Sequence, residues 1–96
     1  MNVHVVLANA MGGVQYCGAF VSRAQAEQHL AKGVFGKNPR VVECAVEGAQ
    51  LKPNVVYVAQ TLNPTMDVHD FVGVYGNFES AQQASGSKGS TLEVTL

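Results

Sequence analysis

Charged residues are scarce in this chain of 96 residues, at 14% against a typical fraction of about 25%. Six Lys and Arg stand against seven Asp and Glu, and the basic residues are spread along the chain. Nucleic-acid binding relies on several phosphate contacts and usually shows as a clearly basic domain. We therefore expect no nucleic-acid partner. A thinly charged surface on a small domain instead favours a partner protein that covers part of it.

Cysteine and long apolar runs are also scarce. Cys17 and Cys44 are too few for a disulfide framework, and both lie in apolar, strand-like runs. We expect them to be buried free thiols in a reducing compartment. No stretch approaches the ~20 apolar residues of a membrane span, and residues 5–10 lack the basic region and apolar length of a signal peptide. The composition predicts a cytoplasmic protein with no membrane partner.

Motifs for metal binding and catalysis are missing. The three histidines are far apart, and none pairs with a cysteine at zinc-finger spacing. The chain has no Gly-x-Ser-x-Gly motif and no phosphate-binding loop in the required order. The best local cluster is a candidate polar site of Asp67, His69 and Asp70 in the turn before a predicted strand. We expect no metal, no cofactor and no catalytic residue, although one sequence leaves catalysis open.

An internal repeat is what the sequence does contain. Alignment of Gly18 with Gly73 brings two ordered series of matches into register, so residues 1–48 and 53–96 read as tandem copies within one domain, residues 1–96. The matched runs are residues 3–8 with 55–60, residues 16–20 with 71–75 and residues 42–46 with 92–96. Each copy predicts two strands, a helix and a third strand.

The predicted helices follow the second strand of each copy. Ser22 and Asn77 are good N-cap residues, and Gly33 and Gly86 are placed to end the two helices. Both helices are short and rich in alanine, which allows close packing on a sheet. The sequence therefore predicts an α+β fold of two tandem ββαβ repeats with pseudo-two-fold symmetry. The predicted fold has one mostly antiparallel sheet of about six strands, with two short helices on one face.

An aromatic–Gly–aromatic pattern in each second strand is the best candidate for an interaction surface. Strict alternation places Tyr16 and Phe20 on one face, and Phe71 and Tyr75 on the same face in the second copy. If both helices cover the other face, these four side chains form an exposed patch, which on soluble domains usually marks a binding site. Alternatively, the sheet curls and the aromatic side chains fill its interior.

Residues 56–60 and 71–81 carry a resemblance. A Tyr-Val-x-Gln strand, a polar turn and a Gly-Val-Tyr strand end lead into a helix that contains Glu and Ala. This pattern resembles a family of small uncharacterised bacterial and phage strand–strand–helix domains, and it recurs weakly at residues 18–22. The resemblance implies a compact accessory or binding module, and it brings no catalytic residues.

These observations favour a small non-catalytic protein-interaction module that binds a protein partner or itself as a homodimer. A phage or mobile-element accessory protein that inhibits a host protein is one concrete form of this hypothesis. The alternative is a small-molecule-binding domain or a cofactor-free enzyme with a pocket between sheet and helices. Shifted pKa values converging in an apolar pocket would favour that alternative.

Overall fold

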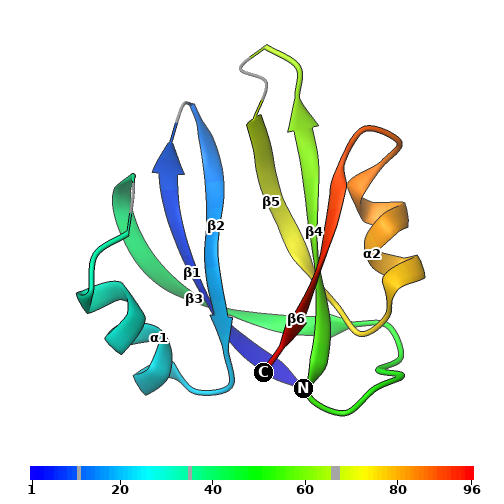
Figure 1. Ribbon diagram of the computed structural model, residues 1–96, viewed down its shortest axis with the longest axis horizontal. Coiled ribbons are helices and arrows are strands. Elements are labelled where there is room, and N and C mark those ends of the chain that lie inside the picture. Colours follow the sequence, from blue (N-terminus) through cyan, green and yellow to red (C-terminus); the bar gives the residue numbers. More distant parts are fainter. Residues whose placement is uncertain (11, 35, 66–67) are drawn as a thin grey trace.

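The computed structural model describes residues 1–10, 12–34, 36–65 and 68–96. Two units of the same element order follow one another along the chain (Figure 1). The first contains β1 (Asn2–Ala10), β2 (Gly13–Phe20), α1 (Arg23–Ala31) and β3 (Lys37–Glu47). The second contains β4 (Val55–Asn63), β5 (Val68–Tyr75), α2 (Phe78–Ser85) and β6 (Ser90–Thr95). The predicted α+β class and the strand–strand–helix–strand order of both copies are confirmed.

The six strands form one sheet in the order β2-β1-β3-β5-β4-β6. The first strand of each copy lies in the middle of its own half, between the other two strands of that copy, and all four of these pairings are antiparallel. The halves join where the end of β3 pairs with the end of β5 in parallel, Val46 beside Val74 and Glu47 beside Tyr75. β2 and β6 are the edge strands.

Backbone hydrogen bonds outside the strands repeat between the two copies. The amide of Val46 donates to the Met1 carbonyl at 2.9 Å, and the amide of Leu96 donates to the Asn54 carbonyl at 2.7 Å. Strand partners agree with this, because Val6 pairs with Gly18 and Ala59 pairs with Gly73. The sequence alignment paired residues 3–8 with residues 55–60. In the structure the equivalent residues of the second copy lie one position later, because Val6 corresponds to Ala59.

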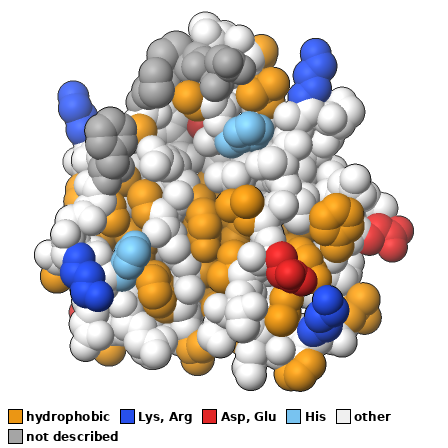
Figure 2. Space-filling view, viewed as in Figure 1, with side chains coloured by type: hydrophobic (Ala, Val, Ile, Leu, Met, Phe, Trp, Pro, Cys, Tyr) orange, Lys and Arg blue, Asp and Glu red, His pale blue; other side chains and the backbone are white. Residues whose placement is uncertain are grey.

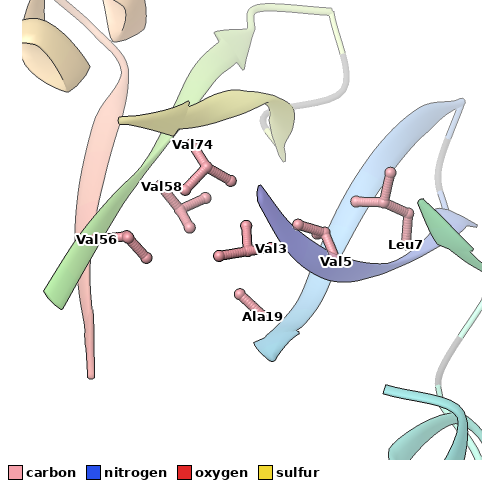
Figure 3. Close-up of a cluster of buried hydrophobic side chains, with 7 residues drawn as sticks. All are labelled: Val3, Val5, Leu7, Ala19, Val56, Val58 and Val74. Carbon is pink, nitrogen blue, oxygen red and sulfur yellow. The ribbon is translucent and has the colours of Figure 1, made fainter. Parts of the chain in front are cut away.

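The sheet curls so that its two halves face each other across a valine-rich core. Side chains of β1 point toward side chains of β4 and β5 across the interior (Figure 3). The cluster consists of Val3, Val5, Leu7, Ala19, Val56, Val58 and Val74. Burial of such apolar side chains is the main favourable term in folding. β-branched valine also suits a pleated surface, which explains why these runs form strands.

Both helices pack on the outer face of the curled sheet, at opposite sides of the molecule (Figure 1). Ser22 accepts a hydrogen bond from the Gln25 amide at 3.2 Å, and Asn77 accepts one from the Ser80 amide at 2.9 Å, so both predicted N-caps are confirmed. Ala26 and Ala81 are the fully buried helical residues against the strands. Neither helix in the described part of the chain is long and apolar enough to cross a membrane.

A β-bulge interrupts β2 and decides which way its aromatic side chains point. Val6 and Leu7 are consecutive on β1, but their partners are Gly18 and Tyr16, so Cys17 is an extra residue. A bulge of this kind breaks the period of two along the strand. As a result, Tyr16 faces the core together with Ala19, while Gly18 lies on the outer face.

β5 has the same bulge at the equivalent position. Ala59 pairs with Gly73 and Gln60 with Phe71, so Val72 is the extra residue. Phe71 packs against the core beside Val74. The rings of Tyr16 and Phe71 then stack across the interior, with centroids 6.3 Å apart and planes inclined by 15°. One aromatic side chain from each copy therefore closes the space between the two halves.

The two glycines after the bulges give a matched pair of stability predictions. A Cβ at Gly18 would lie 3.0 Å from the Phe20 ring on a backbone with φ of 153°, whereas a Cβ at Gly73 would meet the Tyr75 ring at 3.4 Å. Substitution G18A should therefore lower the free energy of unfolding by about 1–2 kcal/mol, and G73A by under about 1 kcal/mol. Urea denaturation of both variants measures this, and equal losses would contradict the bulge geometry.

Candidate protein-interaction surface

The four aromatic residues singled out from the sequence do not form one patch. Tyr16 and Phe71 lie against the core, whereas Phe20 and Tyr75 lie on the outer face, each with its ring over the glycine two residues earlier. The Phe20 ring also contacts His29 of α1, with centroids 5.1 Å apart. Two of the four aromatic side chains, those of Tyr16 and Phe71, thus fill the interior of the curled sheet, which was the alternative arrangement considered from the sequence.

His69 and Asp70, two residues of the predicted polar site, lie in different surroundings. His69 is exposed on β5, and Asp67 lies outside the described residues. Asp70 instead reaches across to β2, where its carboxylate accepts a hydrogen bond from the Val14 amide at 3.1 Å. Its carboxylate occupies the space in which a Cβ at Gly13 would lie, so glycine is needed for this approach. Asp70 therefore ties the second copy to the hairpin of the first.

Neither cysteine is set up as a nucleophile. Both are free and partly buried, and burial raises the pKa of the Cys17 thiol and of the Cys44 thiol. His29 lies near Cys17, but its ring nitrogen Nε2 contacts the Cys17 backbone carbonyl at 3.0 Å. Nucleophilic cysteines need a lowered pKa. Among the described residues, no three His, Cys, Asp or Glu side chains gather closely enough to hold a metal ion.

Within the described ranges, the outer side of α2 carries an exposed aromatic side chain, Phe78. Phe78, the first residue of this helix, is 51% exposed, and Leu51 in the connector between the copies is 76% exposed. The Phe78 ring is held edge-on by Tyr57, with centroids 6.1 Å apart and planes at 82°. Tyr57 donates a hydrogen bond to Glu93 at 2.9 Å. This bond raises the pKa of the Tyr57 hydroxyl.

Two hollows open to solvent flank Phe78. One, of about 660 Å³, lies toward the start of α2 and includes Leu51 and Glu79. The other, of about 570 Å³, extends past the end of α2. The second hollow is lined by Phe78, Gln82, Gln83, Ser85, Gly86, Ser87, Gly89 and Thr91, all uncharged. We call Leu51, Phe78, Gln82, Gln83 and the two hollows the Phe78 surface.

The first copy shows that the fold does not require an apolar group at this position. When the helices are aligned on their N-caps, Phe78 corresponds to Arg23 and Gln82 corresponds to Glu27. Arg23 and Glu27 form an exposed ion pair at 2.9 Å. The outer face of α1 is thus charged and solvated, while that of α2 presents an aromatic ring. Cap alignment of the two helices is the sequence signal that could have identified Phe78.

Charged side chains are also sparse in the middle of the view in Figure 2, where hydrophobic side chains gather between β2 on one side and β4 and β6 on the other. Lys and Arg side chains lie toward the outline. This region adjoins the unpaired edges of the sheet. A small hollow of about 310 Å³ lies here, between the ends of β2 and β6, and includes Phe20, Gln25 and Leu96.

The fold and surface together define a two-copy α+β domain in which one helix exposes an ion pair and the other exposes an aromatic ring. No protein-family model, no curated protein and no solved structure matches the chain. Functional inference therefore rests on its own geometry.

The Asp70 tether predicts a difference between two substitutions at one site. D70A removes the acceptor of the Val14 amide and should lower the free energy of unfolding by about 1–3 kcal/mol, whereas D70N keeps an acceptor oxygen and should cost less. Exposed His69 provides the control, because H69A should change the free energy of unfolding by under about 0.5 kcal/mol. Chemical denaturation distinguishes them, and a larger effect of H69A than of D70A would refute the tether.

Tyr16 predicts a pH dependence of stability in alkali. Burial and, to a lesser extent, the neighbouring Cys17 raise the pKa of the Tyr16 hydroxyl, so the folded state favours the neutral phenol. This contribution is fully present below the unfolded pKa of about 10 and is lost as the pH rises through the folded pKa. Y16F should lose less stability than the wild type between about pH 8 and about pH 11. Urea midpoints at both pH values measure it, and identical losses would count against burial of this hydroxyl.

Proposed function

We propose that this chain is a small non-catalytic protein-interaction module that binds its partner through the Phe78 surface. The observation that carries the proposal is the exposed Phe78 ring at a position where the sister helix has Arg23. Arg23 shows that a charged residue is tolerated at this helical position, so the fold itself does not require an aromatic ring there. Its presence here is therefore best explained by contact with another protein.

The composition of the Phe78 surface supports the same proposal. Aromatic side chains, surrounded by polar groups that exclude water, supply much of the binding energy in protein interfaces. Phe78 is held by Tyr57, so little conformational entropy is lost when a partner covers it. Gln82 and Gln83 provide uncharged hydrogen-bonding groups beside it.

An accessory protein or inhibitor from a phage or mobile element, binding a host protein, is the concrete form that we propose for this module. A cytoplasmic location fits this role, because Cys17 and Cys44 are unpaired and such thiols persist in reducing compartments. The two hollows beside Phe78 are open rather than enclosed, which favours a protein partner over a small molecule.

Site-specific photo-cross-linking tests the proposed surface with a matched control. Gln83 beside Phe78 and Gln28 on α1 occupy equivalent exposed helical positions. A photoreactive residue at position 83 should give a discrete cross-linked protein product in the cells that express the chain, and one at position 28 should not. F78R should remove the product from position 83 while the circular dichroism spectrum and unfolding midpoint stay unchanged.

Two results would overturn this proposal. One is the absence of any product at position 83, and the other is a product that persists in the F78R variant. If F78R unfolds, Phe78 is part of the core. The equivalence of Phe78 with Arg23 would then be wrong, and so would the choice of the exposed control position.

A further inference from the structure

The Phe78 surface contains a projecting ring at the start of α2 and a hollow that runs from this ring past the end of the helix. Phe78 projects from the first residue of the helix, and the hollow of about 570 Å³ extends beyond its last turn. Small residues make room for this hollow. Gly86 ends the helix with φ of 77°, and Ser85 is buried, donating to the Ala81 carbonyl at 2.8 Å. A surface with both features can be complementary to itself.

The first copy lacks the aromatic projection. Arg23 replaces the aromatic projection, and the cap alignment places Leu30 where α2 has the small Ser85. The aromatic projection and the small residue in the last turn are thus present on α2, whereas the equivalent positions of α1 carry Arg23 and Leu30. This joint occurrence is expected if the two features fit each other across a symmetric interface.

The charges beside the two features are also complementary. Glu79 follows Phe78 at the start of α2, and Lys88 lies between hollow-lining Ser87 and Gly89 at the other end. Both side chains are exposed. The ion pairs formed within the described part of the chain are Arg23–Glu27 and Lys52–Glu93. Glu79 and Lys88 are therefore charges of opposite sign at opposite ends of one helix.

We propose that the partner at the Phe78 surface is a second copy of this chain, bound with the two α2 helices antiparallel about a two-fold axis. This inference rests on the proposed function and names its partner. In that arrangement Phe78 of each copy enters the hollow beyond α2 of the other. Glu79 of each copy then approaches Lys88 of the other, so the interface contains two equivalent ion pairs. The dipoles of the two helices also oppose each other favourably.

Sedimentation equilibrium over a wide concentration range, with exchange of the paired charges, tests this interface. The wild type should dimerise, and F78R should weaken dimerisation at least about tenfold. E79K and K88E should each weaken it by about three- to tenfold, because each places two like-charge contacts in the homodimer. An equimolar mixture of E79K and K88E should recover the wild-type affinity as a heterodimer.

The first copy supplies the control for non-specific charge attraction. E27K and K32E change the net charge by the same amounts as E79K and K88E, but they lie on α1. These two variants should dimerise like the wild type, and mixing them should bring no gain. E79K also keeps the test decisive if F78R misfolds, because Glu79 is exposed and forms no ion pair within the described chain, so its substitution should leave the fold intact.

Several outcomes would overturn the second-copy inference. A wild-type chain that stays monomeric to about millimolar concentration has no such interface. A dimer that is insensitive to F78R, or an E79K and K88E mixture that remains monomeric, would place the contact elsewhere. If the wild type is monomeric and the cross-link at position 83 identifies a different protein, the proposed function stands and the second-copy inference fails.

Discussion

The paired β-bulges at Cys17 and Val72 determine how the rest of this molecule is arranged. Each adds one residue to the second strand of its copy, and so turns one aromatic ring inward and leaves the next one outside. Without the bulges, Tyr16 and Phe71 could not point into the interior together with Ala19 and Val74. With them, the two copies meet through a stacked aromatic pair, and the sheet curls around a valine core. Both helices then remain on the outside, where their exposed faces are free to differ.

Much of the fold could be predicted from the sequence because its signals are local. Alternating valines in the first strands, Ser22 and Asn77 before the helices, and glycine after them each act within a few residues. The ordered matches between the copies gave the repeat. Strand order and the parallel contact between β3 and β5 could not be predicted, because they depend on pairings between distant segments. The extra residue in each bulge was also missed, since period-two counting assumes an unbroken strand.

The candidate site was less predictable for the same physical reason. Counting by twos grouped Tyr16 with Phe20, and the bulge separates them. The cluster around His69 was chosen for its chemistry, yet the Asp70 carboxylate accepts a hydrogen bond from a backbone amide. Phe78 gives no signal as a single aromatic at a helix start; its meaning comes from comparison with Arg23. Function in a repeated fold is thus best sought where two copies differ, because positions that differ are free of the constraints that the copies share.

One aromatic residue from each copy packs in the interior of the curled sheet, which leaves Phe78 on the outer face of α2 for binding. A double-mutant cycle of Tyr16→Leu and Phe71→Leu, followed by urea denaturation, measures this directly. Stacked aromatic side chains predict a coupling free energy of about 0.5–1.5 kcal/mol between the two positions. A coupling of zero, with the two losses simply additive, would mean that the rings do not meet across the interior and would contradict the account.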